Sequence, residues 1–229
     1  MKTNILFEDK EIIVIHKPAG IATQTNKLGQ ADVVSELKNY LHRSGQGSYV
    51  GVIHRLDQPV EGLLVFAKTQ QAAKKLTAQL QNGALKKSYS ALVPAIASSL
   101  PQEGELVDYL VKDARTNLSR VVEQSTPDAK EARLKWICKQ TICGKEASYS
   151  LVDVEIFTGR HHQIRVQMSH AGMPLLGDSK YGNEESKVLT QKLGLHQTAL
   201  LARTLTVKHP ATNEFMNFNL AYPLNWKIT

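Results

Sequence analysis

The stretch GVIHRLDQPVEGLLVFAKT, residues 51–69, holds a carboxylate, Asp57, between two apolar segments. Pro59 and Gly62 favour a turn, so the stretch predicts a strand, an exposed turn and a second strand. Reactive side chains tend to lie on loops that a rigid scaffold holds in place. Because a nearby positive charge favours the carboxylate form, Asp57 beside Arg55 is expected to stay ionised, which suits a nucleophile. A turn aspartate paired with a surface arginine is the alternative.

Outward from this stretch, the residue pattern alternates between strands and helices. Asp32 is a candidate N-cap for a helix over residues 32–43, and Thr69 is one for a helix over residues 70–82. Residues 183–196 fit either a helix or a long loop. Strands are expected over residues 4–8, 11–16, 51–57, 62–68, 86–94, 105–112, 119–123, 130–140, 146–157, 200–209 and 214–219. This order predicts an α+β fold with a mixed, mainly antiparallel central β-sheet flanked by helices.

The length and composition bound the class of protein. A chain of 229 residues fits one domain, and we expect a single domain over residues 1–229 with two packed halves about a cleft. The halves are expected to divide near residues 95–105. No apolar run approaches the length that spans a bilayer, and the N-terminus has no secretion signal. We therefore expect a cytoplasmic protein without membrane contact, and a monomer.

The net charge of the chain suggests its partner. Lysine and arginine exceed the acidic residues by seven, an excess that favours a polyanion such as nucleic acid. A basic protein without such a partner is the alternative. Aromatic residues make up only 6% of the chain, which argues against an extended aromatic platform for single strands.

A second informative stretch is EIFTGRHHQIRVQMSHAGMPLLGDSKYG, residues 155–182. Its start continues a half-buried strand, and the spacing of Ile164 and Met168 then predicts a helix. A helix that begins at Arg-His-His would present backbone N–H groups and positive charge to an anion such as phosphate. On that helix, His161 and Arg165 would share a face, one turn apart. An ordinary surface ion pair is the alternative role for Arg165.

The histidines are candidate metal ligands, but the sequence does not support a metal site. His161 and His162 are adjacent, so on a helix their side chains would diverge by about 100 degrees. The chain has neither an HExxH motif nor paired cysteines at metal-ligand spacing. We expect no metal, and a metal-dependent hydrolase built on His54, His161, His162 and His170 is kept as a rival hypothesis.

Residues 54–68, HRLDQPVEGLLVFAK, resemble the signature of the RluA-type pseudouridine synthases: His-Arg-Leu-Asp, then Gly-Leu-Leu-x-x-Ala-Lys. Four further elements agree with the family in order and spacing over essentially the whole chain. They are HKPAG (16–20), KKSYSALV (86–93), TGRHHQIRVQMSHAGMPLLGDSKYG (158–182) and LLARTLTVKHP (200–210). The resemblance implies the pseudouridine synthase catalytic fold and an isomerase that converts uridine to pseudouridine in ribosomal or transfer RNA. It also implies that no cofactor or metal takes part.

The resemblance also assigns roles to single residues. Asp57 is the carboxylate that starts the exchange, Tyr89 stacks on the target base, and Arg165 pairs with Asp57. Arg55 enters the RNA stack when the uridine is flipped out. The remaining RNA contacts implied are Lys87, Arg160 and His162 as phosphate ligands and Ile164 as part of an apolar floor. For each of these residues, packing or surface solvation is the alternative.

The chain departs from the family pattern after the aspartate. Many members carry Thr-Ser-Gly where this chain has Val60, Glu61 and Gly62, and Glu61 adds a negative charge near the expected path of RNA. Some members carry an N-terminal RNA-binding domain of the S4 type, and this chain is expected to select its target without one. A catalytically inactive RNA-binding or ribosome-assembly protein of the same fold is the alternative function.

Overall fold

The chain folds into two compact units. The computed structural model describes residues 3–25, 29–144 and 147–228. The first unit comprises Met1–Lys87 and Ala202–Ala221, and the second comprises Ser88–Leu201 and Tyr222–Thr229. The units therefore divide after residue 87 and again after residue 201, whereas we expected a single division near residues 95–105. The loop at 95–102 stays with the second unit because the strand before it pairs within that unit from Ser88 onward.

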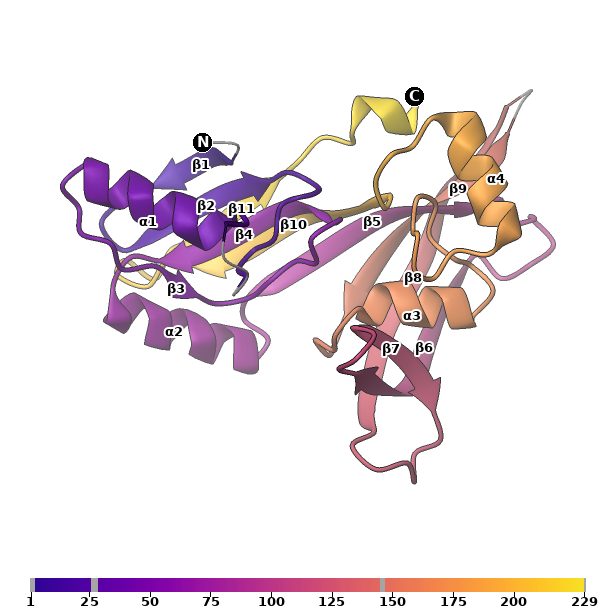
Figure 1. Cartoon of the computed structure of the whole chain (residues 1–229), viewed down its shortest axis with the longest axis horizontal. Coiled ribbons are helices and arrows are strands. Elements are labelled where there is room, and N and C mark those ends of the chain that lie inside the picture. The colour runs from indigo at the N-terminus through magenta and orange to yellow at the C-terminus, as the bar shows by residue number, and fades with distance from the viewer. Residues whose placement is uncertain (1–2, 26–28, 145–146, 229) are drawn as a thin grey trace. The chain divides into compact units, whose positions relative to one another are not determined.

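The first unit is built on a sheet with strand order β1-β2-β4-β10, in which β3 pairs with β4 and β11 pairs with β10. Its elements are β1 (Asn4–Glu8), β2 (Ile12–Lys17), α1 (Val33–Arg43), β3 (Gly51–Val52), β4 (Glu61–Ala67), α2 (Gln70–Gln81), β10 (Leu200–Lys208) and β11 (Phe215–Asn219). Figure 1 shows the C-terminal strands β10 and β11 beside the indigo and violet N-terminal strands. Residues from both ends of the chain thus build one sheet.

Both helices of the first unit begin where their caps predict. The Asp32 side chain accepts a hydrogen bond from the Ser35 backbone N–H at 2.9 Å, and Thr69 Oγ1 accepts one from the Ala72 N–H at 3.0 Å. Each bond satisfies an N–H group that has no partner within its helix. The helices expected over residues 32–43 and 70–82 are confirmed.

The centre of the first unit is the antiparallel pair β2 and β4. Ile13 lies opposite Phe66, and Ile15 lies opposite Leu64. All four side chains are fully buried. Strands covered on both faces need no polar alternation, which explains why both segments read as continuous apolar runs. This pair carries the segments on either side of Asp57.

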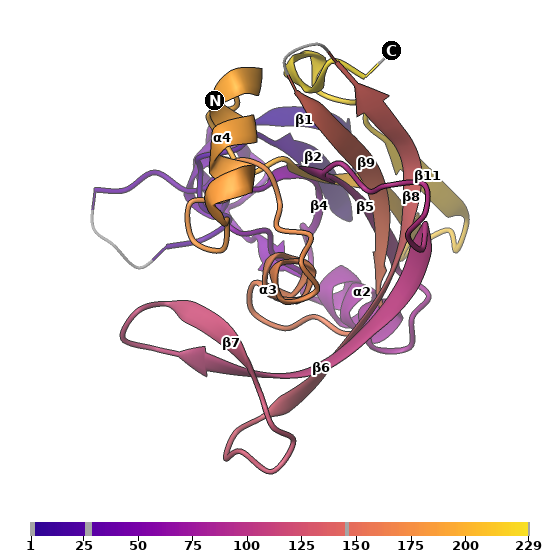
Figure 2. The ribbon, with the colours of Figure 1, turned by 90° about the vertical axis from the view of Figure 1, so that its right-hand side faces the viewer.

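The second unit is a curved antiparallel sheet with strand order β5-β9-β8-β6-β7. Its elements are β5 (Lys86–Pro94), β6 (Glu103–Asp113), β7 (Leu118–Val122), β8 (Lys130–Cys143), β9 (Ser148–Ile156), α3 (Gln163–His170), α4 (Glu184–Leu193) and the 3-10 helix η1 (Leu224–Trp226). Figure 2 shows α3 on the inner side of the curved strands. The chain therefore has the α+β, mainly antiparallel architecture that its pattern predicts.

Helix α3 is attached to the sheet through a buried amide. Gln167 Nε2 donates to the Ala132 carbonyl at 3.0 Å and to Asp108 Oδ2 at 2.8 Å. Val166, one position earlier, packs with Leu110 and Ala132 in a small apolar cluster. These contacts hold the helix that carries Arg165.

Three expectations about local structure are corrected or resolved. The strand expected over residues 51–57 is only Gly51–Val52, because the next residues bond to a distant segment instead of to a neighbouring strand. Helix α3 begins at Gln163, three residues later than Arg160, because His162 has a φ of 56°. The segment 183–196, left open between helix and loop, contains α4.

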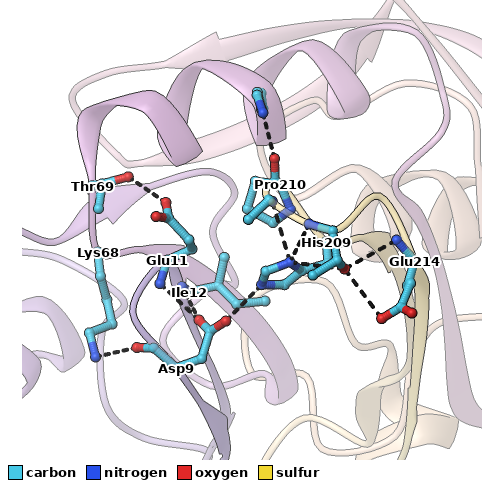
Figure 3. Close-up of polar contacts among 11 residues, drawn as sticks. Asp9, Glu11, Ile12, Lys68, Thr69, His209, Pro210 and Glu214 are labelled. Carbon is cyan, nitrogen blue, oxygen red and sulfur yellow. Dashed lines mark hydrogen bonds and ion pairs between the residues drawn. The ribbon is translucent and has the colours of Figure 1, made fainter.

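A polar cluster ties the N-terminal hairpin to the C-terminal one (Figure 3). His209 Nδ1 accepts from the backbone N–H of Thr212 at 3.1 Å, so Nε2 carries the proton and donates to Asp9 Oδ2 at 2.8 Å. Asp9 Oδ1 accepts from the N–H groups of Glu11 and Ile12, each at 2.8 Å. The Asp-His pair has a structural role, because backbone donors already use the free lone pair of the imidazole.

Asp9→Asn is expected to lower the free energy of unfolding by about 1–3 kcal/mol, since it removes a charged acceptor from three N–H donors. Burial raises the pKa of Asp9, but the Ile12 and Glu11 N–H groups and His209 outweigh it, and the pKa is lowered below 3.8. The stabilisation should therefore be present at neutral pH and disappear as the pH falls below that range. Chemical denaturation of both proteins at pH 7 and pH 3 checks this. A deficit that is equal at both pH values would contradict it.

Candidate active site

Asp57 lies in a turn between β3 and β4. The Val60 N–H donates to the Asp57 carbonyl at 3.1 Å, which closes the turn. Leu56 is buried, Asp57 is half-buried and Arg55 is exposed. The carboxylate thus lies at the surface of the first unit, with an apolar anchor on one side and a solvated guanidinium two residues before it.

Residues 20–23, at the end of the HKPAG segment and just after it, clamp the Asp57 turn through backbone and side-chain groups. The Gly20 N–H donates to the Gln58 carbonyl at 2.8 Å, and Gln58 Nε2 donates to the Gly20 carbonyl at 3.0 Å. Thr23 Oγ1 donates to the Leu56 carbonyl at 2.9 Å and accepts from the Leu56 N–H at 3.1 Å. Both neighbours of Asp57 are therefore fixed by a segment more than 30 residues away in sequence.

A fully buried cation supports the same turn. Lys17 Nζ donates to the carbonyls of Ile21 at 2.8 Å, Pro18 at 3.0 Å and Gln58 at 3.3 Å. Its side chain has no exposed surface. Burial lowers the pKa of Lys17 to about 8, although the charges of Asp57 and Glu61 act to raise it. Lys17 therefore places positive charge behind Asp57 near neutral pH, and this charge depends on pH.

Lys17→Met tests the cost of burying this ammonium. The folded chain loses the Lys17 proton at about pH 8, whereas the unfolded chain keeps it to 10.5. Between these pH values the unfolded state binds more protons than the folded state. As the pH rises through this range, the free energy of unfolding of the wild type should therefore increase relative to that of Lys17→Met. The expected slope approaches about 1.4 kcal/mol per pH unit. Denaturation curves at pH 7.5 and 9.5 measure it, and a difference that does not change with pH would refute it.

His54, the first residue of the signature, is buried and neutral. Its Nε2 accepts from the Val65 backbone N–H at 3.4 Å, while its buried Nδ1 has no hydrogen-bond partner among the described residues. Burial and the charge of Lys87 lower the pKa of His54 well below 6.5. Burial also lowers the pKa of Lys87. Among the described residues, no group of three His, Cys, Asp or Glu side chains could hold a metal ion.

Glu61, the departure from the family pattern, contacts a histidine of the first unit. Its Oε1 lies 2.7 Å from His16 Nε2, and both side chains are about 30% exposed. His16 lies in the HKPAG segment beside Lys17, on which the Glu61 charge also acts. The added negative charge therefore lies beside His16 and acts on the buried ammonium of Lys17.

The start of α3 differs from the phosphate-binding helix end that we expected. Arg160 and His161 precede the helix, so His161 and Arg165 do not share a helical face. The Arg160 N–H donates to Gln163 Oε1 at 3.0 Å, and the same oxygen accepts from Thr158 Oγ1 at 2.8 Å. The side chain of Gln163 thus occupies a backbone donor that was predicted to bind phosphate.

Arg165 is buried within the second unit and bonded to Asp178. Its Nε donates to Asp178 Oδ2 at 2.6 Å, and its Nη2 donates to Oδ1 at 2.8 Å. The two side chains are 2% and 0% exposed. The guanidinium also lies over the ring of Tyr181, 5.1 Å from its centroid. The proposed surface ion pair is excluded as the role of Arg165, because this pair is buried.

Tyr181 joins the histidines to β7. Its hydroxyl accepts from the Ser119 N–H at 2.8 Å and lies 2.8 Å from His162 Nδ1. His161 Nδ1 lies 2.9 Å from Ser119 Oγ, and the rings of His161 and His162 stack at 3.7 Å. His162 is buried, so it belongs to this network and not to an open surface.

The other expected site residues are distributed over both units. Arg55, Asp57 and Lys87 belong to the first unit. Tyr89 lies on β5 of the second unit, opposite Val154, and is buried. Ile164 on α3 is also buried, and Arg160 is exposed, with its Nε donating to the Glu131 carbonyl at 2.7 Å.

The model of the RNA pseudouridylate synthase family matches residues 11–170, which include the Asp57 turn, Tyr89 and Arg165. The chain belongs to the RluA-type RNA pseudouridine synthases. The family places it among the isomerases that form pseudouridine in RNA.

Named relatives of the synthase support this assignment. It is 31% identical to tRNA pseudouridine synthase C of Haemophilus ducreyi, over 100% of this chain and 94% of that protein. It is 32% identical to ribosomal large subunit pseudouridine synthase D of Pseudomonas aeruginosa, over 97% of this chain and 69% of that protein. The structure of human RNA pseudouridylate synthase domain containing 4 aligns with a TM-score of 0.75 at 24% identity, over 96% of this chain and 88% of that one, which shows the same fold.

Three residues around the synthase site were not among the expected site residues. Lys17 was quoted within HKPAG, and Asp178 and Tyr181 within GDSKYG, without a role for any of them. The sequence did contain a signal for these three residues, because each of them lies in a motif shared with the family. Their partners could not be read from the motifs, because Lys17 bonds to a carbonyl 41 residues away.

No helix among the described residues is both long and apolar enough to cross a membrane.

Proposed function

We propose that this synthase isomerises specific uridines in structured RNA to pseudouridine and that Asp57 is the carboxylate that starts the exchange. The observation that carries the proposal is the clamp on the Asp57 turn, in which Lys17, Gly20 and Thr23 bond to the residues on both sides of Asp57. A solvent-facing aspartate in a mere surface turn needs no such support. A catalytic group must be held in position, because small displacements cost large factors in rate.

The reaction balances without a cofactor. The bond between ribose C1′ and uracil N1 breaks, the base turns, and C1′ bonds to C5 of the same base. The hydrogen on C5 leaves as a proton, and N1 takes one up. Asp57 acts as a nucleophile or as a base in this exchange, by attack on the sugar, addition to the ring or removal of a sugar proton.

One carboxylate suits this chemistry better than two. Glycoside hydrolases use a pair of carboxylates and deliver water to the sugar. Here the detached base has to rejoin the sugar, so water must be kept out of the site. Glu61 is engaged with His16, which leaves Asp57 as the carboxylate proposed to react.

We also propose roles for the other residues of the family motifs. Tyr89 would stack on the turning base, since an aromatic face tolerates rotation of its partner. Arg165 would orient Asp57 and favour its charged form. Arg55 would fill the space that the flipped uridine leaves. Lys87 and Arg160 would contact phosphate, and Ile164 would line the apolar floor. His162 was expected to contact phosphate as well, but it is buried beside the Tyr181 hydroxyl.

We propose ribosomal or transfer RNA as the target and a single catalytic domain made of both units. The relatives named above act on transfer RNA and on the large ribosomal subunit, and the net charge of +7 favours a polyanion. Contact along the RNA backbone predicts that affinity falls as the salt concentration rises.

An inactive RNA-binding protein of the same fold remains the second candidate, because Glu61 replaces the usual residue of the motif. The test is to map pseudouridine in total RNA from cells that lack this gene, complemented with the wild type or with Asp57→Ala. We expect one or a few sites to vanish and only the wild type to restore them. Sites restored equally by Asp57→Ala would support the binding function. If no site is lost, the proposed reaction is contradicted unless a second enzyme modifies the same uridine. An assay of pseudouridine formation by the purified protein distinguishes these two cases.

A further inference from the structure

Asp178 engages one particular edge of Arg165. The two hydrogen bonds join Asp178 to Nε and Nη2, the side edge of the guanidinium. An arginine side chain has five N–H donors in a rigid planar fork. Asp178 uses two of them, so the end edge, which carries Nη1, is not engaged by Asp178.

Asp178 is itself held in one orientation. Its Oδ1 accepts from the backbone N–H groups of Lys180 at 3.0 Å and Tyr181 at 3.2 Å, which forms a turn on the side chain. Its Oδ2 bonds to Arg165. Oδ1 therefore serves both the loop and Arg165 Nη2, whereas Oδ2 takes the shorter bond, from Arg165 Nε.

The backbone before Asp178 is also held tightly. The Gly177 N–H donates to Thr190 Oγ1 at 2.7 Å, and a Cβ on Gly177 would lie 2.0 Å from the Gln197 carbonyl oxygen. Gly177 has a φ of +74°. The loop that presents Asp178 thus passes directly against another segment of the same unit and has little freedom to move.

Because the Arg165–Asp178 ion pair is buried, each charged group depends strongly on the other. With side chains 2% and 0% exposed, neither Arg165 nor Asp178 is solvated. Removing one partner of a buried pair leaves an uncompensated charge, which disturbs the other partner strongly. The position of the guanidinium therefore depends on the carboxylate of Asp178.

We infer that Asp178 is a positioning residue of the synthase, which binds the side edge of Arg165 and so fixes the orientation of its guanidinium. The inference rests on the role proposed above for Arg165. It extends that role to a second, fully buried acid that does not touch the substrate.

Asp178→Asn is the decisive variant, because asparagine can keep Oδ1 for the loop while an amide nitrogen replaces Oδ2. The bond from Arg165 Nε is then lost, and the turn at Lys180 and Tyr181 is kept. In purified protein acting on an RNA substrate, we expect kcat to fall about 100-fold, as for a misplaced catalytic group, with KM within about threefold of the wild type. Asp108→Asn is the matched control, since Asp108 bonds to Gln167 and His170 of α3 and not to Arg165. It should keep kcat within about threefold.

A double-variant cycle separates positioning from a general loss of stability. If Asp178 acts through Arg165, the variant carrying Arg165→Ala and Asp178→Asn should be no slower than Arg165→Ala alone. Losses that multiply would overturn the inference. So would an Asp178→Asn protein that keeps kcat while Arg165→Ala loses it.

A spectroscopic readout tests the inference without turnover. The Arg165 Nε–H signal in a nitrogen-15 NMR spectrum, assigned by its absence in Arg165→Ala, should exchange slowly in the wild type and in Asp108→Asn. It should exchange at the rate of solvent-exposed groups in Asp178→Asn. Protection that survives in Asp178→Asn would refute the inference. A wild type that forms no pseudouridine would refute the proposed function instead, and the exchange rate would still decide whether Asp178 holds Arg165.

Discussion

Asp57→Asn is expected to slow pseudouridine formation by about 10⁴-fold, a loss typical of removing a nucleophile or its partner from an enzyme. Asparagine has nearly the same shape as aspartate, and the turn bond from the Val60 N–H uses the backbone carbonyl of residue 57, so the turn should persist. The loss therefore reports the missing charge and nucleophilicity. Because C5 of the base gives up its hydrogen in the reaction, release of tritium from RNA labelled at C5 of uridine measures the rate under single turnover.

Glu61→Gln is the matched control for this result. It removes the same charge from the same motif, four residues farther along the chain, and changes the contact with His16 and the charge that acts on Lys17. We expect it to keep the rate within about tenfold of the wild type. RNA affinity of Asp57→Asn should stay within about threefold, since the carboxylate is not proposed to bind phosphate. A variant at Asp57 that remains active, beside a Glu61 variant that does not, would move the reaction to Glu61.

Gly62→Ala is expected to lower the free energy of unfolding by about 4 kcal/mol. The φ of Gly62 is +142°, a conformation that side chains rarely adopt, and this strain costs about 1–3 kcal/mol. A Cβ would also lie 2.5 Å from Ala202 Cβ and 2.6 Å from its backbone N and O. Overpacking of this kind costs about 1–3 kcal/mol more. Because Gly62 lies opposite Lys17 in the sheet, the Asp57 clamp should loosen as well.

Gly83→Ala separates the cost of the backbone conformation from the cost of overpacking. Gly83 also has a positive φ, of +74°, but a Cβ there would meet nothing within 4 Å. We expect a loss of only about 1–2 kcal/mol, from the backbone conformation alone. Urea denaturation of both variants compares them directly. Equal losses would show that close approach to Ala202 carries no cost, contrary to the prediction.

The local signals in the sequence were sufficient for most of the secondary structure. Asp32 and Thr69 cap α1 and α2 because a side-chain cap acts within three residues of itself. The apolar runs of β2 and β4 also predicted buried strands from local sequence, because burial on both faces of a strand removes polar alternation. The family motifs then identified the reaction class and located Asp57.

Local signals failed where a distant partner decides the backbone. Residues 53–57 were expected to continue the strand that begins at Gly51, but Leu56 bonds to the Thr23 side chain, 33 residues away, and not to a strand. His162 departs from helical geometry although its neighbours favour a helix, and the Gln163 side chain bonds to Thr158 and Arg160, which precede the helix. Neither event has a signature within a window of a few residues.

The sequence by itself determined the family, the order of strands and helices, the caps and the residues most apt for chemistry, because these depend on residue type and short spacing. The tertiary structure alone decided how those residues are supported. It placed Lys17 under the Asp57 turn, bonded Arg165 to Asp178 and joined Asp9 to His209 across 200 residues. A buried charge or polar group takes the partner that the fold brings within about 3 Å, because an unmade bond in the interior is costly. Which partner that is depends on the path of the whole chain.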